Sequence, residues 1–221
     1  MADSFVESLA KTQTVFTAKV LPIIEKFYSF QYECRTIEIE GRAINGKNDT
    51  ITQDFDIFAG IDVYQVREKA LRSDLVSAFD SNMIGIASRV QYGKAWNTFT
   101  VRLSRETGAT TEYAKRKYAI LNNTLYPKLT IQAYVQDDNT TIGICQTVDL
   151  IRYIDMFTPR IQYTRRDQKG QSSFYVCEWA DMQNKGITVI KIEESQGKCI
   201  ASWRTKDGKE AQESFTIEKC A

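Results

Sequence analysis

Hydrophobic and polar positions along this chain of 221 residues follow two periods. Near the N-terminus, apolar residues recur about every 3.6 positions, which predicts a helix over residues 3–30, kinked at Pro22 or broken near Thr12–Thr14. Downstream, period-two alternation predicts strands. The expected strands cover 35–44, 50–58, 61–64, 84–92, 97–105, 128–135, 141–146, 173–179, 187–192, 199–204 and 214–219. Further helices are expected over 111–122 and 148–156, and residues 66–79 are expected to form a short helix or a surface loop.

The order of these elements predicts the class of fold. Strands and helices are mixed without strict alternation, which favours an α+β protein with a central mixed sheet flanked by helices. We expect residues 1–160 to form an α/β core and residues 161–221 to form a β-rich extension packed on it. Three roles stay open for the C-terminal strands: covering the sheet, forming a dimer interface or gripping a ligand.

Composition removes several classes of enzyme. The chain has no histidine, which excludes Ser-His-Asp and Cys-His catalysis and histidine-based metal sites. Hydrolysis would therefore need Mg²⁺ or Mn²⁺ held by carboxylates, with lysine, arginine or tyrosine assisting. The five cysteines include no Cys-x-x-Cys pair, so we expect buried reduced thiols rather than a zinc or iron–sulfur site.

Hydropathy gives an expectation about location. No apolar run approaches the length of a membrane-spanning helix, and the N-terminal residues do not read as a targeting sequence. We therefore expect a cytoplasmic protein with no membrane partner.

Charge is balanced overall but uneven locally. The net charge is +1, whereas residues 89–117 contain seven basic residues against two acidic ones. The basic residues are Arg89, Lys94, Arg102, Arg105, Lys115, Arg116 and Lys117. This excess indicates either a solvated basic face or a surface that binds phosphate, with Arg102, Arg105, Lys115 and Arg116 as the phosphate ligands. Nearby aromatic residues would then stack on bases: Tyr92, Trp96, Tyr113 and Tyr126.

Periodicity also assigns faces within this basic region. In the strand over 84–92, Ile86, Ser88 and Val90 share one face, and Ala87, Arg89 and Gln91 share the other. The helix over 111–122 is expected to bury, at least in part, Tyr113, Ala114, Tyr118 and Leu121. Glu112, at its start, suits the helix dipole without any further role.

The order of helix, strands, an acid at Asp62, a strand carrying Arg89-Val90-Gln91, a basic helix and another strand resembles the PD-(D/E)XK nuclease superfamily. In that family an Asp on one strand and a Glu/Gln-x-Lys on the next hold a divalent cation and the attacking water, sometimes with a helix Glu. The resemblance implies a restriction-endonuclease-like core, with Asp62 and Glu25 as ligands of Mg²⁺ or Mn²⁺.

The same resemblance implies the other catalytic residues. Gln91 would assist at the metal, and Arg89 or Lys94 would take the place of the family's lysine, because Arg89-Val90-Gln91 reverses the family's order of amide and cation. The region also resembles uncharacterised phage proteins loosely grouped with these nucleases, which implies a bacterial or phage-infected cell.

Two functional hypotheses follow. The first is a metal-dependent nuclease that cleaves phosphodiester bonds in DNA or RNA. The alternative is a non-catalytic protein that uses the basic strand–helix surface to bind nucleic acid, a nucleotide or a protein partner. Nucleic acid is the expected partner in the first hypothesis, and a homodimer stays open in both.

Overall fold

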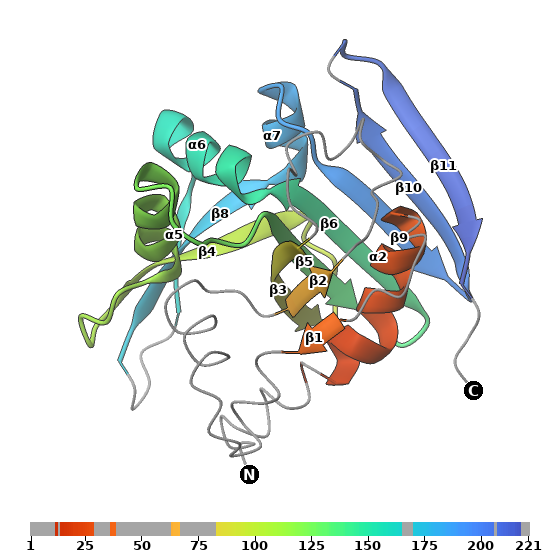
Figure 1. The fold of residues 1–221 in the computed structure, drawn as a ribbon, viewed down its shortest axis with the longest axis horizontal. Coiled ribbons are helices and arrows are strands. Elements are labelled where there is room, and N and C mark those ends of the chain that lie inside the picture. The colour runs from red at the N-terminus through yellow and green to blue at the C-terminus, as the bar shows by residue number, and fades with distance from the viewer. Residues whose placement is uncertain are drawn as a thin grey trace.

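The computed structural model describes residues 12, 14–28, 36–38, 63–66, 83–164, 170–205 and 207–217, and the side chains of 36–38, 63–66, 83 and 84 are not among the described atoms. Within these residues the fold is α+β, with a mixed sheet of eight strands and a second sheet of three (Figure 1). None of the helices that the structure describes is long and apolar enough to cross a membrane.

The larger sheet has the strand order β1-β2-β3-β5-β6-β9-β10-β11. Its strands are β1 (Thr36–Glu38), β2 (Val63–Val66), β3 (Met83–Tyr92), β5 (Leu129–Val135), β6 (Asn139–Gln146), β9 (Ile190–Ser195), β10 (Lys198–Arg204) and β11 (Glu210–Thr216). β3 and β5 are parallel, and the other neighbouring pairs are antiparallel. Parallel neighbours need a crossover connection. Here the crossover runs through β4 (Thr98–Arg105) and the helix α5 (Glu112–Leu121).

The smaller sheet has the order β4-β8-β7, with β8 (Ser172–Glu178) and β7 (Ile161–Tyr163) both antiparallel to their neighbours. Chain segments after residue 160 therefore contribute strands to both sheets. β7 and β8 complete the smaller sheet, and β9, β10 and β11 extend the larger one. The expected division into 1–160 and 161–221 does not separate the two sheets.

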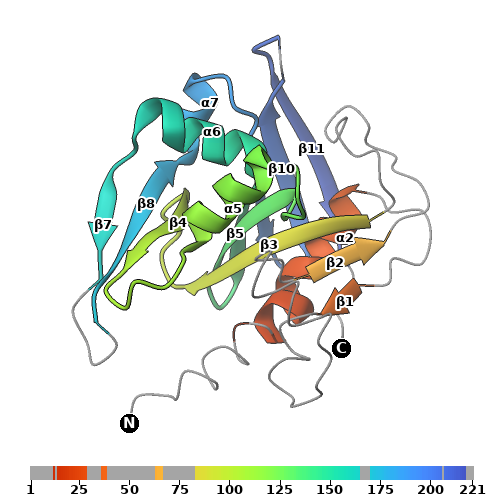
Figure 2. The ribbon, with the colours of Figure 1, turned by 60° about the vertical axis from the view of Figure 1, so that its left-hand side comes forward.

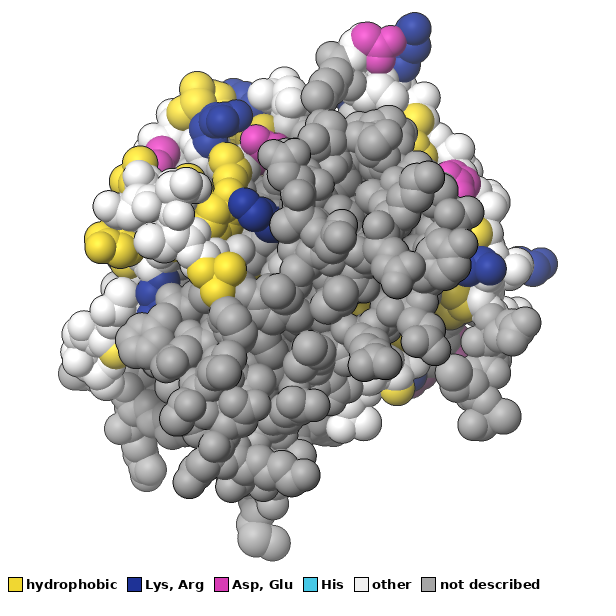
Figure 3. Space-filling view, in the orientation of Figure 1, with side chains coloured by type: hydrophobic (Ala, Val, Ile, Leu, Met, Phe, Trp, Pro, Cys, Tyr) yellow, Lys and Arg dark blue, Asp and Glu magenta, His cyan; other side chains and the backbone are white. Residues whose placement is uncertain are grey.

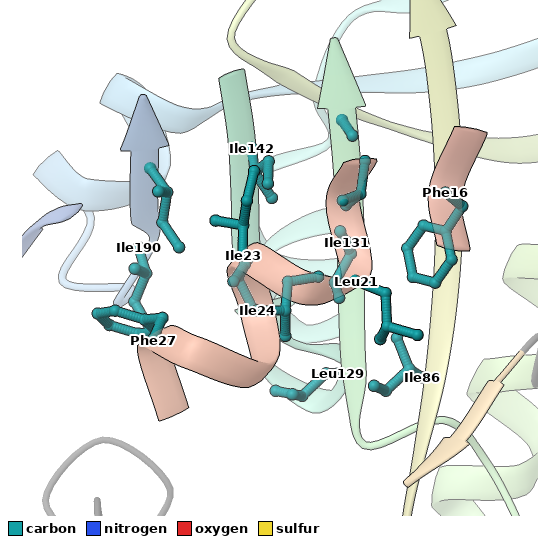
Figure 4. Close-up of a cluster of buried hydrophobic side chains, with 14 of the residues drawn as sticks. Phe16, Leu21, Ile23, Ile24, Phe27, Ile86, Leu129, Ile131, Ile142 and Ile190 are labelled. Carbon is teal, nitrogen blue, oxygen red and sulfur yellow. The ribbon is translucent and has the colours of Figure 1, made fainter. Parts of the chain in front are cut away.

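A first hydrophobic core covers one face of the larger sheet. It is formed by the π-helical turn η1 (Phe16–Val20) and the helix α2 (Leu21–Tyr28), which follow one another without a gap. Their apolar side chains pack on Ile86, Ile131 and Ile142 and on neighbouring strand residues (Figure 4). Ile86 and Val90 belong to this core, which confirms the faces predicted for β3.

The kink expected at Pro22 takes the form of this π-helical turn. Proline has no N–H to donate to the carbonyl one turn back. The N–H of Leu21, the preceding residue, reaches the carbonyl of Phe16 five residues earlier, which is the π-type bond. The wider turn keeps the apolar side chains on either side of Pro22 directed at the sheet.

A second core lies on the opposite face of the larger sheet, between it and the smaller sheet. It includes side chains from α6 (Thr147–Phe157) and α7 (Trp179–Asn184), together with Phe99 and Val101 of β4. Gly143 of β6 is required here, because a Cβ at this position would overlap with the indole ring of Trp179. This second core therefore holds the smaller sheet against the larger one.

Three cysteines in the described residues are buried and free, namely Cys145, Cys177 and Cys199. Burial raises the pKa of each thiol. The expectation of buried structural thiols is confirmed for these three.

Most predicted elements in the described residues are present, with ends shifted by a few residues. The strand expected over 35–44 is described as β1 only, and α7 is a helix that period counting did not predict. The strand expected over 50–58 lies outside the described residues. So do residues 67–79 of the expected short helix or surface loop, whereas Val66 belongs to β2.

Candidate functional site

The helix α5 lies in the angle between the two sheets, beside α6 (Figure 2). Its start is fixed by the preceding residue, Thr111, whose hydroxyl donates a hydrogen bond to the carbonyl of Leu103 on β4 (3.0 Å). The first turn of α5 is thereby tied to the smaller sheet, while its inner face is directed at β3 and β5 of the larger sheet.

Glu112, the first residue of α5, is the centre of a group of charges. Its carboxylate accepts hydrogen bonds from Arg116 Nη2 (2.7 Å), from Arg89 Nη2 (3.1 Å) and from the backbone N–H of Arg102 (3.2 Å). Burial alone would raise the pKa of Glu112, but Arg116, Arg89 and the Arg102 N–H together outweigh it and hold this pKa below its usual range. Glu112 is therefore a carboxylate at neutral pH. We call Arg89, Arg102, Glu112 and Arg116 the arginine–glutamate cluster.

A layer of polar side chains supports the cluster from the two sheets. Arg89 Nη1 donates to the Thr100 hydroxyl (3.0 Å), which donates in turn to Gln132 Oε1 (3.2 Å). Arg116 Nη1 makes a longer contact with the Thr130 hydroxyl (3.4 Å). These contacts join β3, β4, β5 and α5, so the positions of the guanidinium groups are set by both sheets.

Arg102 differs from the other two arginines. Among the described residues, its guanidinium makes no hydrogen bond or ion pair, and its contact is with the ring of Phe174 on β8, 5.2 Å from the ring centroid. Arg89 lies over the same ring at the same distance. Burial, followed by the charges of Arg105 and Arg89, lowers the pKa of Arg102 from 12.5 to about 10. The protein thus holds a guanidinium where its charge is unfavourable.

The cluster also contains donors without acceptors. Within the described residues, four buried side-chain polar atoms have no hydrogen-bond partner, and three of them belong to the cluster and its support: Arg102 Nε, Arg116 Nε and Gln132 Nε2. Arg116 is 4% exposed and Gln132 1% exposed. A buried donor without an acceptor costs about 1–3 kcal/mol. Donors gathered in this way, beside three guanidinium groups and one carboxylate, are suited to an anion.

The structure brings some of the predicted site residues together and leaves others apart. Arg89, Arg102 and Arg116 form the cluster, and Arg105, exposed at the end of β4, is close enough to lower the pKa of Arg102. The other predicted residues are not in the cluster. Gln91 is half-buried on the Arg89 face of β3, and Lys115 is half-buried on α5. Lys94 is exposed, with its ammonium 4.9 Å from the ring centroid of Trp96.

The expected metal ligands are not assembled in the described residues. Asp62 lies outside them. Glu25 is on α2, which packs on the Ile86 face of the larger sheet, whereas Arg89 is directed to the other face. No group of three or more Asp, Glu or Cys side chains in the described part of the chain is placed to hold a metal ion.

The expected buried face of α5 is wrong for three of its four residues and confirmed for Tyr113. Tyr118 and Leu121 are 67% and 74% exposed, and Ala114 is exposed, whereas Arg116 is buried. Tyr113 is half-buried and donates a hydrogen bond to Asp155 of α6. The exposed surface of α5 and α6 consequently shows hydrophobic side chains beside basic ones, on the left of the face in Figure 3.

Glu112, Thr100, Gln132 and Phe174 were missed as site residues in the sequence. One local signal was available, because Glu112 and Arg116 are spaced i, i+4 and Glu–Arg pairs at this spacing meet on a helix. The other contacts join residues far apart in the chain and have no local signature.

Comparisons with family models, with curated proteins and with solved structures find no match to this chain.

Proposed function

We propose that this chain binds nucleic acid through phosphate contacts made by the arginine–glutamate cluster, without catalysing a reaction. The observation that carries the proposal is Arg102, a part-buried guanidinium that makes no ion pair or hydrogen bond in the described residues and is close enough to Arg105 and Arg89 for their charges to lower its pKa. A phosphate group would supply the missing acceptor and the missing negative charge.

Arginine suits this role for a geometric reason. Its planar guanidinium presents parallel N–H groups that match two phosphate oxygens, and it is desolvated more easily than a lysine ammonium. Arg89 and Arg102 both keep donors that their described contacts do not use. Arg116 and Glu112 lie beneath them and hold the arrangement in place.

An exposed aromatic residue in the connection that follows β3 favours nucleic acid over a free anion. Tyr92, which is 50% exposed, is set apart from the cluster, because it lies on the Ile86 face of β3 and Arg89 lies on the other face. Trp96, in the β3–β4 connection, is 64% exposed and has Lys94 over its ring. Aromatic rings beside a basic groove are the platform on which single-stranded bases stack.

The test is a binding titration in EDTA. Fluorescently labelled single- and double-stranded DNA and RNA are titrated with the protein over a series of KCl concentrations. The logarithm of the affinity should fall linearly with the logarithm of the KCl concentration. Arg102→Gln should lower the affinity, and it should reduce the slope of this line by the amount expected for the loss of about one phosphate contact.

The matched control is Arg204→Gln, which removes the same charge from β10, four strands from β3 in the larger sheet, or about 19 Å. It should change affinity much less than Arg102→Gln. Absence of binding by the wild-type protein to every nucleic acid tested, or equal effects of the two variants, would refute the proposal.

A second candidate is metal-dependent cleavage, which the order of elements favours. α2 is followed by the antiparallel strands β1, β2 and β3, then by β4 of the smaller sheet, by α5 and by β5 parallel to β3. This is the order on which the resemblance to PD-(D/E)XK nucleases rests. Cleavage of DNA or RNA that requires Mg²⁺ or Mn²⁺ and is lost in Asp62→Ala, with the variant still folded, would establish it. Cleavage that is unchanged in Asp62→Ala would remove Asp62 from the site.

A further inference from the structure

We infer that the arginine–glutamate cluster recognises a terminal phosphate, the phosphomonoester at the end of a nucleic-acid strand, in preference to the diesters within it. This inference rests on the proposed function and names the part of the nucleic acid that the cluster takes. It follows from the charge of the cluster and from the depth of its donors.

Charge gives the first reason. The cluster holds three arginines and one glutamate, and two of the arginines form ion pairs with that glutamate, so the cluster carries an excess of two positive charges in a part-buried place. Charges removed from water need partners. A phosphodiester carries one negative charge, whereas a phosphomonoester carries between about 1.5 and 2 at pH 7, because its second pKa is about 6. The monoester therefore balances the cluster more completely than the diester does.

Depth gives the second reason. The unpartnered Nε atoms of Arg102 and Arg116 and the Gln132 amide nitrogen are buried, so a strand that passes over the surface does not reach them. An internal phosphate carries a sugar on each side. A terminal phosphate has a sugar on one side and three free oxygens on the other, so it can be inserted while the rest of the strand stays outside.

Unused N–H groups give the third reason. Arg89 directs one guanidinium nitrogen at Thr100 and another at Glu112, which fixes its plane without using all five of its N–H groups. The Arg102 guanidinium contacts the same Phe174 ring, and the charge of Arg89 is near enough to lower the pKa of Arg102. Two arginines with unused N–H groups are thus available to the three oxygens of a terminal phosphate.

The experiment compares oligonucleotides that differ only at one end. Single strands of one sequence are prepared with a 5′-phosphate, a 3′-phosphate or hydroxyls at both ends, and binding to the full chain is measured by fluorescence anisotropy in EDTA at pH 7.5. One of the phosphorylated strands should bind about tenfold more tightly than the hydroxyl strand, which corresponds to one added charge-assisted contact. Inorganic phosphate should compete with this preference and leave the binding of the hydroxyl strand largely unchanged.

Two variants and a change of pH assign the preference to the cluster. Arg89→Gln should bring the strands to within about twofold of each other, whereas Arg204→Gln should keep the ratio of the wild-type protein. At pH 5.5 the terminal phosphate loses most of its second charge, and the ratio should fall for the wild-type protein.

The outcomes separate the preference for a terminal phosphate from the proposed binding of nucleic acid. Equal binding of all three strands by the wild-type protein overturns the inference and leaves the proposed function standing. A preference that survives in Arg89→Gln overturns the assignment to the cluster. No binding of any strand overturns the inference together with the proposed function.

Discussion

Replacing Arg102 with methionine should stabilise the free protein and weaken its binding to nucleic acid. Residues kept for function often lower stability, because a site built for a charged ligand is strained while it is empty. Arg102 is suited to testing this in the present chain, since its guanidinium has no ion-pair or hydrogen-bond partner in the described residues.

The expected gain in the free energy of unfolding follows from the lowered pKa of Arg102. Burial first, then Arg105 and Arg89, lower the pKa of Arg102 from 12.5 to about 10. At about 1.4 kcal/mol for each tenfold change in proton affinity, the upper limit on the cost of keeping this charge is ~3.4 kcal/mol. The side chain is only partly buried, so solvent screening reduces the cost to about 1–2 kcal/mol.

Methionine also changes the contact with Phe174. The variant loses a cation–π interaction worth about 0.5–1 kcal/mol. A sulfur–aromatic contact of about 0.3–1.5 kcal/mol replaces most of it. The net expectation is a stabilisation of about 1 kcal/mol.

Urea unfolding followed by tryptophan fluorescence measures the gain, since the chain has three tryptophans. The midpoint should rise with an unchanged m-value. Arg204→Met, which removes an arginine whose described hydrogen bond to Asn184 is long (3.5 Å), should shift stability by less than about 0.5 kcal/mol. An Arg102→Met variant less stable than the wild-type protein would show that Arg102 holds the fold together, and the reasoning from its unpaired charge would be wrong.

Two further predictions concern single residues. Glu112→Gln should destabilise the protein by about 2–4 kcal/mol near pH 7, because it leaves Arg89 and Arg116 without a carboxylate. Since folding lowers the pKa of Glu112, its contribution is complete above about pH 4.3 and is lost as the pH falls towards its folded pKa, so urea midpoints of variant and wild type should converge in acid. Gly143→Ala should cost about 1–3 kcal/mol in the same assay, because the added methyl group overlaps with Trp179, and a variant as stable as the wild-type protein would contradict the packing described for the second core.

The pattern of the sequence was sufficient for elements whose partners are apolar. β3 shows this, since Ile86 and Val90 lie in the first core and Arg89 on the other face, as period-two alternation predicts. The strands of the larger sheet were found for the same reason, because a strand against a hydrophobic layer must place its apolar residues on one side. The pairing of β4 was not predictable, since β4 belongs to the smaller sheet and pairs with β8, some seventy residues later in the chain.

Helix α5 shows why the site was harder to predict than the fold. A helix stripe predicts burial only when the helix faces a hydrophobic surface. The inner face of α5 meets Arg89 of β3 and Thr130 of β5, so Arg116 is the residue buried and Tyr118 is left outside. Nothing within the sequence of α5 indicates the polarity of its neighbours.

The position of the cluster follows from the connection between β3 and β5. A parallel pair needs a crossover, and in this chain the crossover first adds β4 to a second sheet and only then returns through α5. Because this connection passes through β4, α5 lies between the two sheets and not flat against one of them. Strand side chains therefore contact α5 from both sheets. Arg89, Arg102, Glu112 and Arg116 all belong to this one connection and the strand that precedes it. Their charge excess therefore lies in a part of the fold that the second hydrophobic core anchors through β4 and α5, and a marginally stable domain can carry such a cost only where packing offsets it.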